Sequence, residues 1–412
     1  MSKLKWIITI IVAVVIVFGL NYYLNGKICW IREASAVNIV RRVIPGGPVQ
    51  YLAQDGNYVI AVGVVSEEND DCALYLYDTK GTYNNFDDDT YTIIDQIDSN
   101  NGWFTHVTID GNYATWIDST EWSSCTALKL KCYCISTESL FVISSNVADY
   151  MYSRDGNLVV YECRGNDSDI KLFNLDTREE SNICTADNFQ KAPYLKNNII
   201  VWEDLRNEAT TGKDIYMYSL ETGSESVVCN AVGDQEEPIT NGNYIVYEHM
   251  TYNGNEIEKK LIKFEISTSN SFTIASTTNE YESFSSRDIN EQYLAWTRSI
   301  TSNEGKLSSY RLNLYNLSSS SNTIVEDQEE LGGQAQNCLG HYASMSNNQL
   351  VYGGIWSGIY GFTITSLNKY SIRTTGETWG LNLNRDENTV IMNSKGSSLN
   401  PNEWDISLAF IP

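Results

Sequence analysis

The sequence is short of basic residues and of histidine, and both shortages restrict what it can do. It has 28 Lys and Arg against 52 Asp and Glu, a formal net charge of -24 that is spread along the whole chain. A nucleic acid would be repelled by that charge, so no nucleic-acid partner is expected. Only three histidines are present, and neither an HExxH nor a GxSxG motif occurs. A cation, a neutral glycan or another protein remains as a partner.

Long apolar runs are also scarce, and the one that exists lies at the N-terminus. Residues 6–20 carry no charge. Extended to residue 24 as a helix, this run would rise about 28 Å, close to the roughly 30 Å of a bilayer core. Lys3 and Lys5 precede it and favour a cytoplasmic N-terminus.

These features predict a single-pass protein of the cell membrane. The predicted segments are a cytoplasmic N-terminus at 1–5, a transmembrane signal-anchor helix at 6–24, a linker at 25–36 and an extracytoplasmic domain at 37–412. The alternative is a secreted protein, cleaved near Ala36 after a small-residue sequence.

From residue 37 onward the sequence lacks helical periodicity and shows short strands separated by polar turns. One cassette recurs: a short strand, a tight turn, an apolar strand, a polar loop, an amphipathic strand, a turn and a last strand. Its apolar strands start roughly 39 to 57 residues apart, a spacing typical of propeller blades. The starts are Tyr58, Tyr113, Leu158, Ile199, Tyr244, Tyr293, Leu350 and Thr389. The sequence therefore predicts an all-β propeller of eight blades, with seven as the alternative count.

The tight turns and the chain ends support the same architecture. Asp55, Asp110 and Asp155 each begin an Asp-Gly-Asn turn, where Gly and Asn tolerate positive φ. The last cassette stops after its third strand, whereas a spare strand, residues 37–44, precedes the first cassette. We expect this spare strand to pair with Trp404–Phe410 and close the ring, since closure removes open sheet edges.

One cassette resembles a known family. VWEDLRN at Val201–Asn207, DIYMYSLETG at Asp214–Gly223 and QEEPITNGNYIVYE at Gln235–Glu248 resemble the TolB-type propeller repeat. In that repeat Trp, Asp and Arg-Asn close the second strand, and Asp-Ile-Tyr opens the third. The likeness is good over residues 190–250, and it implies a propeller in an extracytoplasmic setting. It implies no role in the Tol system, because the eight cassettes exceed the six blades of TolB.

Within this cassette we expect a cluster that locks the blade, with the Trp packed between sheets and an Asp paired to Arg. Its residues are Trp202, Asp204, Arg206, Asp214 and Tyr216. The alternative is a ligand-facing loop.

Metal sites have weak candidates only. His106 and His341 fall in first strands and His249 ends a second strand, so the three could bind a metal in the central channel only by converging from separate blades. A channel metal held by histidines is known in a propeller lyase of the TolB-like kind, yet scattered histidines are the favoured interpretation. Acidic loops could offer oxygen ligands to calcium, but solvated surface charge is favoured there. These loops are Glu67–Asp71, Asp87–Asp89 and Asn166–Asp169.

Nine cysteines are present without any CxxC motif. Outside the cytoplasm they should be partly oxidised, and their odd number leaves at least one unpaired. The sequence does not determine which cysteines pair with which. They are Cys29, Cys72, Cys125, Cys132, Cys134, Cys163, Cys184, Cys229 and Cys338.

Two functions follow from these observations. The preferred one is a membrane-anchored binding or scaffold module that displays variable loops to a protein or glycan, without a cofactor. The alternative is a propeller-based polysaccharide-active enzyme with a metal in the central channel. Four long inserted loops favour the first, and the shortage of histidine weakens the second. The loops are 66–71, 118–125, 251–259 and 299–308.

Overall fold

The computed structural model describes most of the chain from residue 31 onward. The described residues are 31–32, 39–43, 52–64, 72–81, 89–97, 102–120, 127–165, 167–254, 256–303, 307–329, 342–354, 358–373, 377–383, 389–395 and 404–410. They contain strands and turns but no helix. A helix able to span a membrane is therefore not found among them. The predicted anchor at 6–24 lies outside the described residues.

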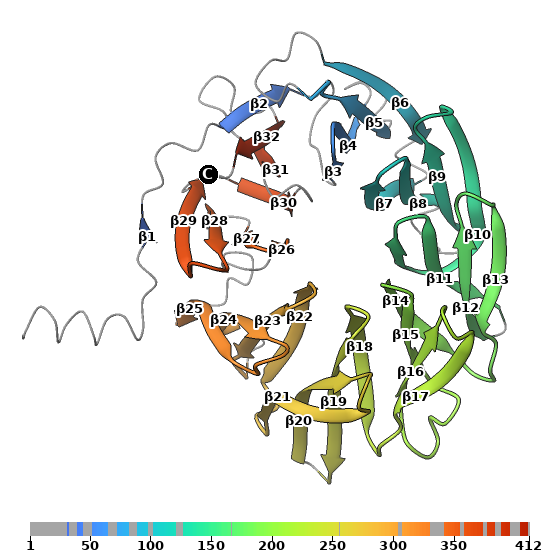
Figure 1. Cartoon of the computed structure of the whole chain (residues 1–412), viewed down its shortest axis with the longest axis vertical. Coiled ribbons are helices and arrows are strands. Elements are labelled where there is room, and N and C mark those ends of the chain that lie inside the picture. Colours follow the sequence, from blue (N-terminus) through green and yellow to red (C-terminus); the bar gives the residue numbers. More distant parts are fainter. Residues whose placement is uncertain are drawn as a thin grey trace, which may run out of the picture.

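The strands form antiparallel sheets that stand around a common centre, like the blades of a propeller (Figure 1). Four sheets each contain four consecutive strands. The first is β3 (Leu52–Asp55), β4 (Tyr58–Val64), β5 (Cys72–Asp78) and β6 (Thr90–Ile97). Another is β14 (Gln190–Lys196), β15 (Ile199–Asp204), β16 (Asp214–Ser219) and β17 (Ser224–Cys229). Next is β18 (Asp234–Thr240), β19 (Tyr244–Asn253), β20 (Glu256–Glu265) and β21 (Asn270–Thr277). The fourth is β22 (Glu282–Ile289), β23 (Tyr293–Thr301), β24 (Leu307–Asn316) and β25 (Asn322–Glu329).

A larger sheet joins two such units through one long strand. Residues 139–147 of β10 pair with β9, and residues 147–155 pair with β11, so the same strand ends one unit and begins the next. The sheet contains β7 (Gly102–Asp110), β8 (Tyr113–Thr120), β9 (Ala127–Cys134), β10 (Ser139–Asp155), β11 (Leu158–Arg164), β12 (Ser168–Asn174) and β13 (Glu179–Cys184).

The two remaining sheets include strands from the N-terminal region. One contains β26 (Tyr342–Met345), β27 (Gln349–Gly354), β28 (Gly358–Thr363) and β29 (Asn368–Arg373), with β1 (Ile31–Arg32) parallel to β29. The other contains β30 (Glu377–Leu383), β31 (Thr389–Lys395), β32 (Trp404–Phe410) and β2 (Ile39–Val43). In it β2 runs antiparallel to β32, from Ile39 opposite Ala409 to Val43 opposite Asp405. The segment expected to close the ring contains β2.

Within each unit the first strand lies nearest the centre and the fourth at the rim (Figure 1). The first strands contact one another in turn: β3 with β7, β7 with β10, β10 with β14, β14 with β18, β18 with β22, β22 with β26, and β26 with β30. Contacts between β30 and β3 complete the circle. We call the end of the sheets with the first-to-second and third-to-fourth turns the turn face. The opposite end, with the second-to-third loops and the links between sheets, is the loop face.

The core lies between neighbouring sheets, because each second strand is apolar on both sides. In six units an aromatic side chain occupies the fourth position of the second strand and is buried. These are Trp116, Tyr161, Trp202, Tyr247, Trp296 and Tyr352. Their polar tips find partners: the Trp116 indole donates to Asp95 (3.1 Å) and that of Trp296 donates to Asn322 (3.1 Å). A large ring with a satisfied polar tip suits such a position.

The first strands β7, β14, β18 and β22 each carry a bulge or irregularity in their pairing with the second strand. His106, Ala192 and Glu237 occupy equivalent bulge positions in β7, β14 and β18, and all three have φ near +50°. In β14 and β18 the next residue is Pro193 or Pro238. Proline is tolerated in a strand at such a bulge because no ladder hydrogen bond is lost there.

Side chains at the first-to-second turns link each sheet to the next. Glycine at these turns has positive φ, as the sequence predicts: +52° at Gly56, +57° at Gly111 and +60° at Gly156. The residue at the start of the turn then bonds to the backbone of the following turn, and we call this series the turn belt. Backbone N–H groups donate from Gly111 to Asp55 (2.6 Å), from Gly156 to Asp110 (3.1 Å) and from Asn197 to Asp155 (2.8 Å). Side-chain amides donate from Asn197 to the Asn241 carbonyl (2.9 Å), from Asn241 to that of Asn290 (2.9 Å) and from Asn290 to that of Ser346 (2.7 Å).

Candidate functional site

The residues of the TolB-like motif come together in the β14–β17 sheet. Asp204 is fully buried and accepts from the Trp202 indole (2.9 Å) and from the Arg206 backbone N–H (2.9 Å). The Arg206 guanidinium donates to both Asp204 oxygens (2.8 and 2.7 Å) and lies over the Tyr216 ring, 4.0 Å from its centre. Burial with this many donors leaves Asp204 no free acceptor for a ligand.

The rest of the motif extends this network on the loop-face side. Asp214 is buried opposite Asp204 on the neighbouring strand and accepts from the Asn207 amide (2.9 Å). Arg206 also donates to Glu225 (2.8 Å) and contacts the Cys184 sulfur of the preceding sheet (3.1 Å). These contacts are those that a blade-locking role requires, and that role stays a prediction.

The structure does not bring the described histidines together. His106 is exposed at the bulge of β7, with its Nδ1 3.1 Å from the Thr105 hydroxyl. His249 lies on β19, with its Nε2 3.2 Å from the Val232 carbonyl. His341 lies outside the described residues. Among those that are described, no three His, Cys, Asp or Glu side chains are placed to hold a metal ion.

The calcium candidates fall mainly outside the described residues. Glu67–Asp71 and two residues of Asp87–Asp89 lie there, as does Asn166. Asp169 is described, and burial, with a contribution from Asp167, raises the pKa of its carboxyl. The calcium prediction therefore stays untested.

Six of the nine cysteines are described, and each is a free thiol. The expected partial oxidation is thus not found among them. They face the spaces between sheets: Cys184 contacts Arg206, and Cys229 packs with Tyr247 of the next sheet. The six are Cys72, Cys132, Cys134, Cys163, Cys184 and Cys229.

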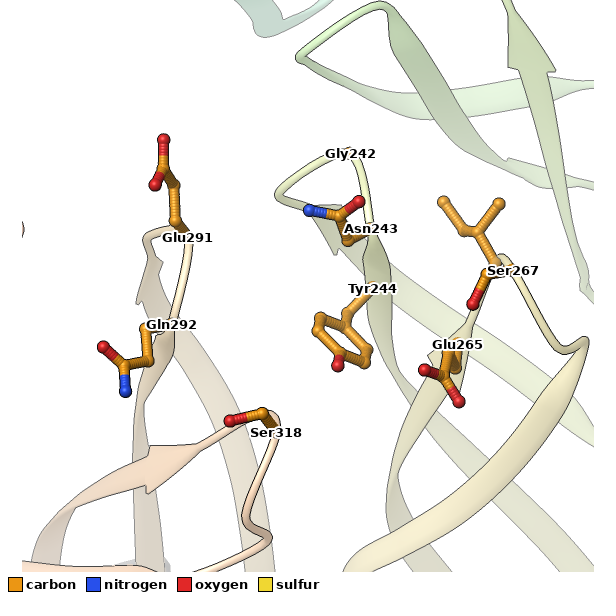
Figure 2. A pocket seen from close by; sticks show the side chains of 9 residues that line it. Gly242, Asn243, Tyr244, Glu265, Ser267, Glu291, Gln292 and Ser318 are labelled. Atoms are coloured by element: carbon orange, nitrogen blue, oxygen red, sulfur yellow. The ribbon is translucent and has the colours of Figure 1, made fainter.

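A polar hollow of about 460 Å³ opens on the turn face between the β18–β21 and β22–β25 sheets (Figure 2). Asn243, Tyr244 and Glu265 line one side, with Gly242, Ile266 and Ser267 beside them. Glu291, Gln292 and Ser318 line the other. The sequence analysis missed this hollow because its two sides come from turns of different cassettes.

The loop face is continuous around the same part of the ring, because second-to-third loops bond to the links between sheets. The Leu205 N–H donates to the Phe189 carbonyl (2.9 Å), and the Gly233 N–H to the Thr211 carbonyl (2.8 Å). In the neighbouring sheets the Lys259 ammonium donates to the Glu280 carbonyl (2.9 Å), and the Thr301 N–H donates to that of Tyr281 (2.8 Å).

Four large apolar or aromatic side chains are exposed on this face. Phe189 is 42% exposed, Val232 74%, Tyr252 59% and Tyr281 38%. Three of them belong to links between sheets, and Tyr252 lies near the tip of the long β19–β20 hairpin. The loop face therefore presents three exposed aromatic rings and one exposed valine.

Carboxylates with raised pKa values lie near these side chains. Burial, reinforced by Glu237 and Glu236, raises the pKa of the Glu248 carboxyl to about 8. Burial likewise raises the pKa of Glu203, although its carboxylate accepts the Glu237 N–H (2.9 Å). The Lys213 ammonium pairs with Glu236 and lies 3.6 Å from Glu203. This region therefore holds more acidic groups than nearby cations can neutralise.

Two titratable side chains with raised pKa values also lie on first strands. Asp288 accepts from the Met345 N–H of the next sheet (2.7 Å) and from the Ile289 N–H (2.8 Å), and burial raises its pKa to about 6. Tyr194, on a sheet two places away, has its pKa raised by burial and by the charges of Asp288 and Asp155. Tyr194 packs against the core between the β14–β17 and β18–β21 sheets.

Comparison with solved structures identifies the same architecture. The computationally designed Ika8 protein matches with a TM-score of 0.53 at 13% identity, covering 90% of this chain and 98% of that one. An oligogalacturonate lyase in complex with manganese matches with a TM-score of 0.50 at 11% identity, covering 74% and 87%. The chain has a β-propeller fold. No protein-family model matches the sequence, and no curated protein does.

Other matches add little to this propeller assignment. A prolyl endopeptidase structure matches with a TM-score of 0.53 at 8% identity, and the match covers 86% of this chain but 55% of that one. TolB from Acinetobacter baumannii matches at 14% identity with a TM-score of 0.38, too low to carry an argument. At such identities the comparisons establish the fold alone.

Proposed function

We propose that this propeller is a surface binding module that engages a protein partner through its loop face. The observation that carries the proposal is the exposure of Phe189, Val232, Tyr252 and Tyr281 on that single face. Exposed aromatic rings of this kind are enriched at the centres of protein interfaces. Of the four loops expected from the sequence, 251–259 is mostly the ends of β19 and β20 and 299–308 includes the ends of β23 and β24, so both belong to long hairpins that reach the loop face. The loop 66–71 and most of 118–125 lie outside the described residues.

The two faces differ in how far their connections can vary, and this difference suits a binding role for the loop face. On the turn face the turn belt fastens short turns to one another, which leaves them little freedom to vary. On the loop face the connections differ in length from sheet to sheet, as in scaffolds that carry binding residues on loops.

The proposal includes a ring of eight blades closed by β2 and held at a membrane by residues 6–24. The unbroken circle of first-strand contacts and the pairing of β2 with β32 support the blade count. The apolar run and the two lysines before it support the anchor. Resistance of the full-length protein to alkaline carbonate extraction would support anchoring, and release into the supernatant would instead support cleavage near Ala36.

The binding proposal is tested by recovering partners with the full-length protein from envelope extracts. Tyr252→Ser and Tyr281→Ser together should reduce recovery of any specific partner at least about tenfold, since interface aromatics often contribute more than 1.4 kcal/mol. Leu367→Ser is the matched control, because Leu367 is equally exposed but lies in a turn-face turn. Equal loss in the control, or no loss in the double variant, would contradict the choice of face. A glycan array run in parallel shows whether a glycan is bound in place of a protein.

A further inference from the structure

We propose that the hollow between the β18–β21 and β22–β25 sheets is a binding site for a sugar that carries a free amino group. We call this hollow the inter-sheet site (Figure 2). It lies on the turn face, so it is separate from the loop face and its partner. Its volume of about 460 Å³ lies within the range of small-ligand sites and suits one or two sugar rings.

The side chains of the inter-sheet site are free to bond to a ligand. Those of Asn243, Tyr244, Glu291 and Gln292 make no hydrogen bond to any other described residue. The Glu265 carboxylate has one bond, from the Thr268 hydroxyl (2.8 Å), and keeps further acceptor capacity. Together they offer donors and acceptors beside an aromatic ring, a combination suited to the hydroxyls and apolar face of a sugar.

The charge of the site selects the class of sugar. Glu265 and Glu291 lie on opposite sides of the hollow, and no Lys or Arg is among its lining residues. The nearest buried cation, Lys263, is only 4% exposed and donates to the Leu317 carbonyl (2.7 Å), so its ammonium is already engaged. Lys263 interacts electrostatically with Glu265 and offsets part of its charge, whereas Glu291 makes no bond to a described cation. The remaining negative charge repels a uronic acid and attracts an ammonium group.

Three inter-sheet hydrogen bonds from two buried side chains hold the sides of the site at a fixed separation. The Asn241 amide, 1% exposed, crosses to the carbonyls of Asn290 (2.9 Å) and Glu291 (3.1 Å). Beneath the site the Lys263 ammonium makes its bond to Leu317 from one sheet to the other, with its charge over the Tyr244 ring at 5.4 Å. A site whose sides are already fixed loses less entropy when a ligand binds.

The test is titration calorimetry on the full-length protein in detergent with four probes. These are the β-1,4-linked glucosamine disaccharide, its di-N-acetylated form, a galacturonic acid disaccharide and the diamine putrescine. The glucosamine disaccharide should bind at least about tenfold more tightly than each of the others, because only it combines the charge with the hydroxyls. Absence of binding, equal affinity for the acetylated form, or equal affinity for putrescine would overturn the proposal.

Variants assign the binding to the inter-sheet site. Glu265→Gln and Glu291→Gln should each weaken binding of the glucosamine disaccharide by about tenfold, since each removes one charge-assisted contact. Glu221→Gln is the control, because Glu221 is an exposed carboxylate in the corresponding third-to-fourth turn of the β14–β17 sheet. Undiminished affinity in both site variants, or equal loss in the control, would overturn the assignment. Thermal unfolding of each variant confirms that it is folded, and partner recovery through the loop face should be unaffected.

Discussion

At the scale of single residues, buried carboxylates in this protein have two different kinds of surroundings. Asp204 is surrounded by hydrogen-bond donors from Trp202 and Arg206. Glu248 lies in a buried place close to other acids, which favours its protonated form. A buried carboxylate is therefore the centre of a hydrogen-bond network in one sheet, and in another it is expected to make stability depend on pH.

Asp204→Asn should lower the free energy of unfolding by about 2 to 4 kcal/mol. The amide cannot accept all the bonds from Trp202 and Arg206, and it leaves the partly buried guanidinium with only the partly exposed Glu225 as a counter-charge among the described residues. Urea denaturation measures the loss. Glu225→Gln removes a partly exposed contact of the same arginine and should cost no more than about 1 kcal/mol. Equal losses in the two variants would contradict the locking role of Asp204.

Stability should fall as pH rises from about 5 to 8. The folded-state pKa of Glu248, about 8, lies above its ordinary value of 4.5, and that of Asp288, about 6, lies above 3.8. Between those values the folded chain keeps protons that the unfolded chain has released, so raising the pH favours unfolding. Melting temperatures at pH 5, 6.5 and 8 measure the trend. Glu248→Gln should flatten it between pH 6.5 and 8, and an unchanged slope would show that Glu248 is not responsible.

At the scale of elements, the turn belt makes each first-to-second turn a joint between two sheets. The Asp155 carboxylate accepts the Asn197 N–H (2.8 Å) and the Lys196 ammonium (2.8 Å), both from the next sheet. A turn that bonds forward in this way fixes the angle between neighbouring sheets as well as its own hairpin.

Asp155→Ala should lower the free energy of unfolding by about 1 to 2 kcal/mol, because it removes two inter-sheet bonds at once. Chemical denaturation measures the change. Asp187→Ala makes the same substitution at an exposed position on the loop face, where it should cost about 0.5 kcal/mol or less. A loss at Asp155 as small as that at Asp187 would show that the turn belt adds no stability.

Gly242→Ala should destabilise the protein more than Gly111→Ala. Both glycines have positive φ, +90° and +57°, so a side chain at either site is strained by about 1 kcal/mol or more. A Cβ on Gly242 would also lie 2.6 Å from the Asn197 Cβ of the preceding sheet, whereas one on Gly111 meets nothing within 4 Å. Denaturation of the two variants compares the costs, and equal costs would exclude the close approach.

The strands were predictable from the sequence because each cassette repeats its apolar and turn positions within a short window. The positive φ of Gly56, Gly111 and Gly156 was also predictable, since the Asp-Gly-Asn turns demand it. The forward bonds of the aspartates were not foreseen. The sequence did contain an indication of these bonds, because an aspartate recurs at the same turn position as Asp55, Asp110 and Asp155. The geometry of the turn is enough to explain that recurrence, so the bonds to the next turn could not be inferred from it.

The candidate site was less accessible to sequence analysis than the fold. The TolB-like motif gave the residues around Trp202, which lie within one sheet and close in sequence. The inter-sheet site combines Asn243 with Gln292 from separate sheets, and no local pattern relates two such turns. Which exposed rings share the loop face likewise depends on how successive sheets stack.

At the scale of the whole molecule, the ring depends on a pairing between the two ends of the chain. Five residues of β2 pair with β32, which would otherwise present an open edge. Removing residues 37–44 from a chain that starts at residue 37 should lower the melting temperature by about 5 °C or more. Calorimetry measures the shift, and light scattering shows whether the open edge promotes association. An unchanged melting temperature would exclude closure by β2.

The pairing of β2 with β32 also dictates an order of events during synthesis. β2 is translated before strands β3 to β31, and its partner β32 is translated after them. Adjacent sheets can stack one after another as they emerge, because their contacts are local in sequence. The pairing of β2 must instead wait until β32 has been made, and contacts between such distant segments form slowly. Until then β2 lacks its partner strand, so the time for which this edge stays open depends on how fast β30 to β32 are translated.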